Sequence, residues 1–218
     1  SGLVTPVRSG TWPHPTLARR AVAVAAIFVG LLMTGPAAFA AIGSTGDGPM
    51  DIAVDGNGNI YTANNNSSTI SKISSGRVST VSFASTDSHP EAIAVDGQGN
   101  IYTANATINC APDTVSKVTS SGVTTQVWGH TGCRPRDIVV DPDGNVYTAN
   151  FGSDTVTKIL PDGTSTPSWV STGHGPISMA LDAHGNIYTA NYNSDTVTKI
   201  SPDGTTIVSW ATTGDGPR

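Results

Sequence analysis

A seven-residue segment that occurs four times constrains this chain more than any other feature of its sequence. The first copy reads Gly-Asn-Ile-Tyr-Thr-Ala-Asn, from Gly58 to Asn64, and the later copies begin at Gly99, Gly144 and Gly185, at intervals of 41, 45 and 41 residues. A fixed period of about 40 residues is typical of a protein in which one supersecondary unit is copied and stacked. We therefore interpret the rest of the chain as what surrounds this segment in each copy.

The first forty residues differ in composition from the repeats. Arg19 and Arg20 precede an apolar run over residues 21–33, and Ala38-Phe39-Ala40 follows it. A basic flank, a short apolar core and an Ala-x-Ala end are typical of a secretory signal, so we predict a signal region over residues 1–40. An uncleaved anchor is the alternative, although the apolar run is short for a membrane span. The signal predicts a secreted, cell-surface or periplasmic protein, with no membrane association after cleavage.

The charge of the chain argues against one class of partner. Removing residues 1–40 removes three arginines and no acidic residue, so the formal net charge changes from −5 to −8, which is −5 − 3. Nucleic-acid binding needs clustered Lys and Arg, so we predict no nucleic-acid partner. Good helix formers are scarce, and Glu91 is the only glutamate, which favours β structure.

One repeat contains four short strand patterns. In the fourth copy they cover residues 177–181, 187–190, 196–200 and 206–210, separated by turn sequences such as Pro202-Asp203-Gly204. Four short antiparallel strands per repeat predict an all-β propeller. After the signal region we expect one propeller domain over residues 41–218. Its blades are expected at about 48–88, 89–133, 134–174 and 175–215, with a fifth starting at 215–218.

The last residues of the chain repeat the start of the first blade, because 214–217 match 46–49. We therefore expect a fragment of a larger propeller that does not close into a ring by itself. Its first and last blades should expose apolar faces or be paired between chains.

Two further positions recur in every copy. An aromatic residue in the fourth strand pattern should cover the outer edge of the blade and pack on its neighbour, and carbohydrate stacking is the alternative. A lysine in the third strand pattern should lie along the sheet with its amine in solvent, and a ring of cations that binds an anion is the alternative. These residues are Phe83, Trp128, Trp169 and Trp210, and Lys72, Lys117, Lys158 and Lys199.

The repeat also resembles known families. The motif Pro-x-x-Ile-Ala-Val-Asp-x-x-Gly-Asn-Ile-Tyr-Thr-Ala-Asn, followed by Ser-Asp-Thr-Val-Thr-Lys-Ile and Pro-Asp-Gly-Thr, resembles the NHL repeat and the blades of streptogramin (virginiamycin B) lyases. The resemblance implies a propeller of six or seven blades that serves as a sensor, a binding scaffold or, in some members, an enzyme. The lyases use a His and Glu pair with a divalent metal, but Glu91 does not map onto matching positions in this chain.

Residues that repeat in every blade are weaker site candidates than residues that depart from the repeat. The loops between second and third strands should share one face with the connections between blades. Asn64, Asn105, Asn150 and Asn191 should lie there, either as loop caps or as a ring that binds a polar ligand. Asp113, Asp154 and Asp195 have the same two interpretations. His89 and Arg134 replace a glycine of other copies, and with His130, Arg136 and His174 they are the preferred binding candidates. A base or metal-ligand role is the alternative for the histidines, but no metal-ligand spacing supports it, and we predict no cofactor, no metal and no catalytic residue.

The two cysteines of the chain are predicted to form a disulfide. Cys110 lies in a loop that is four residues longer than its counterparts, and Cys133 lies in the connection to the next blade. Both positions belong to one face and one blade boundary, and an exported protein meets an oxidising compartment. Two free thiols, or a redox pair, are the alternative.

These observations favour an exported binding module that takes a small polar ligand or a protein partner through its loop-rich face. A lyase-like enzyme with an incomplete active site is the first alternative, and a purely structural cell-surface repeat is the second.

Overall fold

The computed structural model of the protein describes residues 44–110 and 112–217. The predicted signal region, residues 1–40, lies outside the described residues, as does Arg218. The described chain forms four separate antiparallel sheets, each made of four strands that follow one another in the sequence. Across this part of the chain, no helix is long and apolar enough to cross a membrane.

Each sheet is one predicted blade, and we number the blades 1 to 4. Blade 1 contains β1 (Pro49–Val54), β2 (Ile60–Asn64), β3 (Thr69–Ile73) and β4 (Ser79–Ser85). Blade 2 contains β5 (Pro90–Val95), β6 (Ile101–Asn105), β7 (Thr114–Val118) and β8 (Thr124–His130). Blade 3 contains β9 (Pro135–Val140), β10 (Val146–Asn150), β11 (Thr155–Ile159) and β12 (Ser165–Ser171). Blade 4 contains β13 (Pro176–Leu181), β14 (Ile187–Asn191), β15 (Thr196–Ile200) and β16 (Thr206–Thr212).

The repeated segment is explained by the turn that joins the first two strands of a blade. In blade 1, Gly58 has φ of 76°, which the turn requires and which glycine adopts at little cost. Asp55 accepts hydrogen bonds from the backbone of Asn59 and, through its other oxygen, from the Asn59 amide at 2.8 Å and the Tyr61 hydroxyl at 3.1 Å. Asp96, Asp141 and Asp182 form the same set of bonds in the other blades. The Asp, Gly, Asn and Tyr of each copy therefore specify one hairpin.

The core lies between neighbouring blades, not inside any one of them. One face of blade 1 contributes Tyr61, Ala63 and Ile70, and the facing side of blade 2 contributes a different set, Ile93, Ile101 and Val118. We call the first kind of surface the trailing face and the second the leading face. The same two surfaces meet between blades 2 and 3 and between blades 3 and 4. Small Thr and Ala beside Ile and Tyr let the sheets approach closely.

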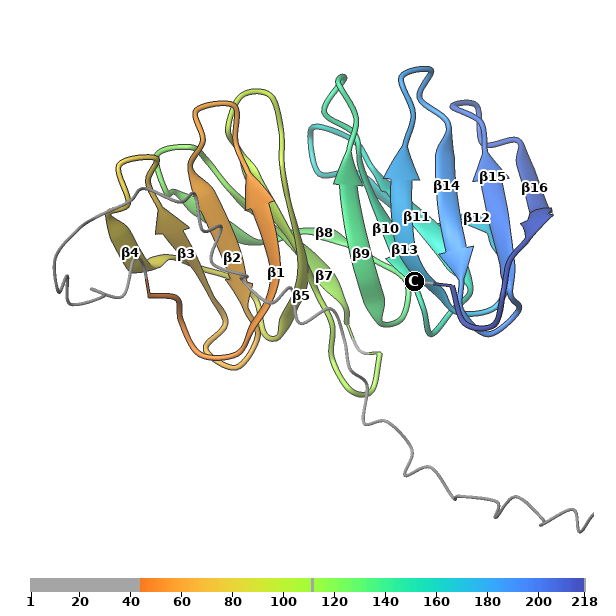
Figure 1. Cartoon of the computed structure of the whole chain (residues 1–218), viewed down its shortest axis with the longest axis horizontal. Coiled ribbons are helices and arrows are strands. Elements are labelled where there is room, and N and C mark those ends of the chain that lie inside the picture. Colours follow the sequence, from red (N-terminus) through yellow and green to blue (C-terminus); the bar gives the residue numbers. More distant parts are fainter. Residues whose placement is uncertain (1–43, 111, 218) are drawn as a thin grey trace, which may run out of the picture.

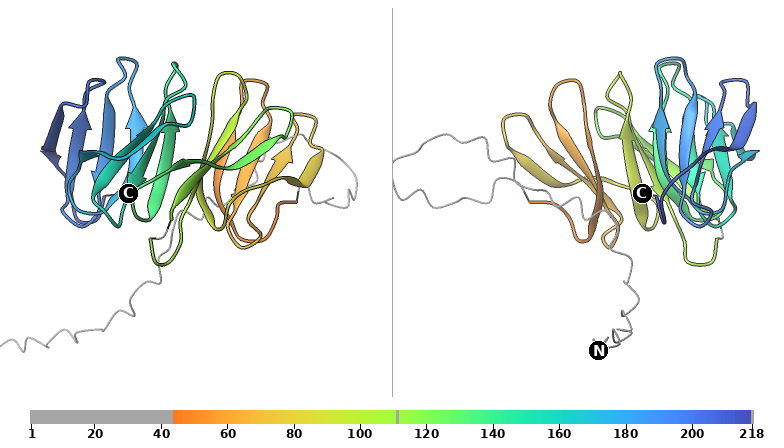
Figure 2. Two further views of the ribbon diagram at one scale, coloured as in Figure 1. Left: turned by 180° about the vertical axis from the view of Figure 1, so that it is seen from behind. Right: turned by 45° about the vertical axis from the view of Figure 1, so that its right-hand side comes forward.

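The first strand of each blade lies on the inner side of the row, and the blades follow one another along it. β1 contacts β5, β5 contacts β9, and β9 contacts β13. Figures 1 and 2 show blades 1 and 4 at opposite ends of this row. Val54 on the leading face of blade 1 is 61% exposed, and Trp210 on the trailing face of blade 4 is 50% exposed. The prediction that the two end blades expose apolar faces is thus confirmed for the described residues.

The outer edge of each blade is covered as predicted. The aromatic residue of the fourth strand lies against the tyrosine of the second, with ring centroids 5.2 Å apart for Tyr102 and Trp128. The lysine amine lies over these rings, for example at 5.0 Å from Trp128 for Lys117. A turn glycine of the next blade packs on the aromatic residue, so that a Cβ at Gly204 would lie 3.3 Å from Trp169. The aromatic residues therefore join successive blades.

Candidate functional site

The loops between second and third strands lie on the same face as the connections between blades, and we call this face the loop face. In blade 1, the backbone N–H of Asn65 donates to the Gly48 carbonyl at 2.8 Å, and that of Thr86 donates to the Ser68 carbonyl at 2.9 Å. The loop is thus tied to the segment that enters its blade and to the segment that leaves it. The same bonds recur at Phe151 and Thr172 in blade 3. The loop face is a rigid surface because backbone bonds hold each loop at both ends.

The structure places the four repeated asparagines inside the blades. Asn64 accepts a hydrogen bond from the Thr62 hydroxyl at 2.9 Å, and its amide nitrogen is 2.9 Å from the Ser71 hydroxyl, to which it donates. Equivalent bonds hold the other three residues of this set, Asn105, Asn150 and Asn191. All four are at most 2% exposed. Their partners are side-chain hydroxyls of the same blade rather than the loop N–H groups expected of caps.

The repeated aspartates cap the next blade. Asp113 accepts from the backbone N–H of Arg134 at 2.6 Å, Asp154 from that of Gly175 at 2.7 Å, and Asp195 from that of Gly216 at 2.8 Å. Each of these N–H groups belongs to the residue directly before a proline, and the prolines after Arg134 and Gly175 open first strands. Asp113 therefore positions Arg134, whereas the backbone N–H of His89 donates to the Ser68 hydroxyl at 3.4 Å.

His89 and Arg134 occupy a backbone conformation that favours glycine. Their φ angles are 55° and 54°, close to the 66° of Gly48 and the 68° of Gly175. A left-handed conformation costs a residue with a Cβ about 1–2 kcal/mol, and such strain concentrates at functional sites. A Cβ at Gly175 would lie 2.6 Å from the Asn193 amide, so blade 4 has no room for a side chain there. Blades 2 and 3 provide that room, and both use it for a cationic or titratable group.

Arg134 belongs to a cluster of five side chains, which we call the arginine cluster: Asn65, Glu91, Arg134, Arg136 and Phe151. Arg136 and Glu91 form an ion pair at 3.0 Å, with side chains only 9% and 10% exposed. The Asn65 amide donates to the other Glu91 oxygen at 3.3 Å. Both guanidinium groups lie over the Phe151 ring, each 5.7 Å from its centroid. The cluster joins blades 1, 2 and 3.

Only some of the predicted binding residues lie together. Arg134 and Arg136 share the Phe151 ring, and the structure adds Asn65, Glu91 and Phe151 to them. Sequence reasoning did not select these three, although a signal exists. Asn65 and Phe151 directly follow the repeated asparagine, at a position that is Ala106 in blade 2 and Tyr192 in blade 4.

The structure gives His174 and His130 partners outside the arginine cluster. His174 is in the connection from blade 3 to blade 4, where its Nδ1 is 2.8 Å from an Asp154 oxygen, with side chains 78% and 38% exposed. His130 ends the outermost strand of blade 2, and its backbone N–H donates to the Ser165 hydroxyl at 3.2 Å.

The predicted disulfide is confirmed. Cys110 and Cys133 are joined, with their Cα atoms 4.7 Å apart and a sequence separation of 23. Closing a loop of this length stabilises the folded chain by about 3 kcal/mol in the chain-entropy description. The bond ties the long loop of blade 2 to the residue before Arg134. Together with Asp113, it fixes the backbone of Arg134 from two sides.

Comparison with known proteins supports the fold. No protein-family model matches the chain, and no curated protein sequence matches it. Among solved structures, a streptogramin B lyase superposes with a TM-score of 0.61 at 17% identity, over 74% of this chain and 54% of that chain. A chain of a nidogen/laminin complex superposes with a TM-score of 0.58 at 15% identity, over 73% of this chain and 62% of that one. The extracellular domain of a one-component system protein from B. thetaiotaomicron also has a TM-score of 0.58 at 15% identity, over 75% of this chain and 24% of that one.

This chain has a β-propeller fold. The predicted fold class is confirmed, and the neighbours of the propeller include a lyase, a protein complex and an extracellular domain. The chain spans 54% of the length of the lyase it matches. Identities of 15–17% carry the fold alone, so the function of the propeller has to be argued from its own residues.

One potential metal group occurs among the described residues of the propeller: Cys110, Asp113 and Cys133. The disulfide uses both sulfur atoms, and thiolates are the form of cysteine that binds metals. The Asp113 carboxylate is also occupied, because it accepts from the Thr107 N–H at 2.7 Å and from Arg134. In this oxidised form the group is a structural element of the loop face.

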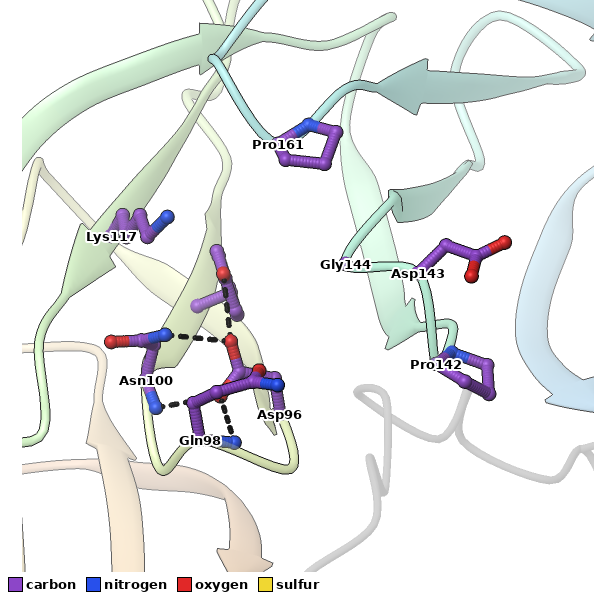
Figure 3. A pocket seen from close by; sticks show the side chains of 9 residues that line it. Asp96, Gln98, Asn100, Lys117, Pro142, Asp143, Gly144 and Pro161 are labelled. Carbon is purple, nitrogen blue, oxygen red and sulfur yellow. Dashed lines mark hydrogen bonds between the residues drawn. The ribbon is translucent and has the colours of Figure 1, made fainter.

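A cleft of about 260 Å³ lies between blades 2 and 3 on the face opposite the loops. Figure 3 shows Asp96, Asn100 and Lys117 on one side and Pro142 and Asp143 on the other. The Asp96 carboxylate already accepts four hydrogen bonds, from Gln98, Asn100 and the Tyr102 hydroxyl. Burial, and then the charge of Asp96, raise the pKa of Tyr102 well above its ordinary value. Five of the nine lining residues, Asp96, Asn100, Tyr102, Lys117 and Gly144, recur in every blade, which favours a structural role.

Proposed function

We propose that the propeller is a noncatalytic binding module whose loop face recognises an anionic group, such as a carboxylate, through Arg134 and His89. The observation that carries the proposal is the left-handed backbone at both residues, where three other copies have glycine. Retaining a side chain at such a position costs stability, so a use for that side chain is the economical explanation. Arg134 offers a planar guanidinium, which suits a carboxylate.

The surroundings of Arg134 favour an anionic ligand with a flat apolar part. Arg136 is neutralised by Glu91 at 3.0 Å, and it shares the Phe151 ring with Arg134. The ring holds the Arg134 guanidinium and adds apolar surface beside it. The disulfide and Asp113 fix the backbone below, which reduces the entropy lost on binding. An aromatic carboxylate matches this combination of charge and flat surface.

Export is part of the proposal. A disulfide is typical of an oxidising compartment, and one of the solved neighbours is an extracellular domain. The signal-like sequence over residues 1–40 supports the same location. In its finer form, the proposal is that the blades are NHL-type repeats and that the ligand is a small polar molecule or a protein partner.

The lyase alternative has less support in the described residues. Its basis is the similarity in fold to a streptogramin B lyase. Glu91, the only glutamate of the chain, is bound to Arg136 and Asn65. The His174 and Asp154 pair is exposed to solvent, where a general base gains little from its surroundings.

Benzoate and its neutral counterpart benzamide test the proposal directly. We expect benzoate, and not benzamide, to shift the NMR signals of the Arg134 guanidinium and the His89 imidazole. Arg134→Gln should weaken benzoate binding by about tenfold, because a hydrogen bond to a charged group contributes about 1.5–3 kcal/mol. His130→Gln, on the outermost strand, is the matched control and should leave binding unchanged. Equal binding of the two probes, or shifts confined to residues outside the loop face, would overturn the proposal.

A further inference from the structure

The leading face of blade 1 has the same chemistry as the leading faces inside the propeller. Blades 2 to 4 use an apolar residue at each of four positions to pack on the preceding blade; in blade 2 they are Ile93, Val95, Ile101 and Val118. Blade 1 has an aliphatic residue at every equivalent position: Ile52, Val54, Ile60 and Ile73. Ile101 and Val118 are fully buried, whereas Ile60 and Ile73 are only partly buried. Within residues 44–110 and 112–217, blade 1 therefore carries a blade-packing surface that no other blade covers.

The trailing face of blade 4 repeats the opposite surface. In blade 1 this surface consists of Tyr61, Ala63, Ile70 and Phe83, packed on blade 2. The equivalents in blade 4 are Tyr188, Ala190, Val197 and Trp210. Tyr61, Ala63 and Ile70 are buried, but the blade 4 residues are partly buried or exposed. The two ends of the row are thus the two complementary halves of the contact that is made three times between the blades.

We propose that two copies of this chain associate head to tail, with the trailing face of blade 4 of one copy packed on the leading face of blade 1 of the other. The contact would repeat the blade-to-blade packing already present, so it needs no new complementarity. This chain matches 54% of the lyase chain and 62% of the nidogen/laminin chain, so part of each of those chains has no counterpart in one copy of this chain. Because the two faces differ, the contact is heterologous and closes or extends according to its rotation.

One residue of the leading face departs from the internal pattern. Gly122, Gly163 and Gly204 pack on the aromatic residue of the preceding blade, and a Cβ at Gly163 would lie 2.6 Å from the Trp128 carbonyl oxygen. Blade 1 has Arg77 at this position, with φ of 66°. The contact between copies must therefore open slightly at its outer edge. An arginine there can stack its guanidinium on the indole of Trp210 from the other copy.

Two single substitutions and their mixture test this contact in the full chain. Ile73→Glu places a charge on the leading face, and Val197→Glu places one on the trailing face. We expect the wild-type chain to associate as concentration rises in sedimentation velocity experiments. Each variant alone should be monomeric, with association weakened by at least about tenfold, because a buried unpaired charge is strongly unfavourable. An equimolar mixture should form a one-to-one complex, since each variant keeps the face that the other has lost.

The controls separate this contact from other causes of association. Val123→Glu changes a residue that is 66% exposed in a turn of blade 2, and it should associate like the wild type. Circular dichroism checks that each variant is folded, and Val54→Glu replaces Ile73→Glu if that variant is not. A monomeric wild type at every concentration would overturn the proposal. Association that survives both substitutions would assign the contact to other segments, and a mixture that stays monomeric would show that the two faces do not pair.

Discussion

At the scale of single residues, a substitution at His89 measures the effect of this side chain on stability separately from its effect on binding. Its φ of 55° is strained for histidine and ordinary for glycine, which three other copies have. His89→Gly removes about 1–2 kcal/mol of backbone strain from the folded state. It also makes the unfolded chain more flexible, which lowers the free energy of unfolding by about 0.5–1 kcal/mol. We expect the variant to be as stable as the wild type or up to about 1 kcal/mol more stable in urea unfolding, while benzoate binding weakens.

The matched control for this prediction is Gly175→Ala, at the equivalent position of blade 4. Its φ is 68°, and a Cβ there would lie 2.6 Å from the Asn193 amide nitrogen. This variant should lose stability, and it is a control for stability alone, because its Cβ would also lie 3.0 Å from Cε2 of Phe151 in the arginine cluster. A large loss of stability in His89→Gly would instead assign His89 a structural role and remove the argument from backbone strain.

At the scale of the hairpin, the tyrosines of the first three repeats predict a response to alkaline pH. Burial, and then the Asp55 carboxylate, raise the pKa of Tyr61 to about 12, and the same causes raise the pKa of Tyr102 and of Tyr147 further. A raised pKa in the folded state contributes stability that is complete below the ordinary tyrosine pKa, near 10, and is lost as pH rises through the folded value. We therefore expect the propeller to lose stability progressively above about pH 10.

Absorbance of the tyrosinate form checks this expectation. Tyr61 should ionise near pH 12 in the folded protein, and Tyr102 and Tyr147 only at higher pH or on unfolding. Asp55→Asn removes a negative charge beside Tyr61 and should lower the pKa of that tyrosine alone. Asp162→Asn, in an exposed turn, is the control and should leave the titration unchanged. Ionisation of all three tyrosines near pH 10 in the folded protein would contradict the hairpin geometry.

The same hairpin shows why the fold was easier to predict than the site. A period of about 40 residues, turn sequences and strand patterns are local signals, and four copies reinforce one another. The copies also placed Cys110 and Cys133 on one blade boundary, and the disulfide followed. Side-chain direction carries no such signal. Asn64 was expected in a loop at the end of a strand, but it points into the blade toward the Ser71 hydroxyl. The pairing of Glu91 with Arg136 joins residues 45 apart, and no repeat predicts it because each occurs once.

At the scale of the whole molecule, the same substitution at equivalent positions of blades 1 and 2 shows whether the leading face of blade 1 is covered. The quantity to compare is the loss of stability that each substitution causes. Ile101 in blade 2 is fully buried against blade 1, whereas Ile60 in blade 1 is only partly buried. Truncating a buried isoleucine to alanine costs about 2–5 kcal/mol, and less where the side chain already contacts water. In dilute protein, Ile101→Ala should therefore be clearly more destabilising than Ile60→Ala in urea unfolding.

Protein concentration turns this comparison into a second test of the head-to-tail contact. If copies associate, the leading face of blade 1 becomes an interior surface, and Ile60 is then in the environment of Ile101. Association also stabilises the folded state by mass action, so the unfolding midpoint of the wild type should rise with concentration. Ile60→Ala should show a smaller rise, because it weakens the contact, whereas Ile101→Ala should follow the wild type. The losses of stability caused by Ile60→Ala and Ile101→Ala, each relative to the wild type, should thus become more similar as protein concentration increases. A gap that stays constant while the protein associates would place the contact on another surface, and equal costs in dilute protein would mean that the first blade is already covered within one chain.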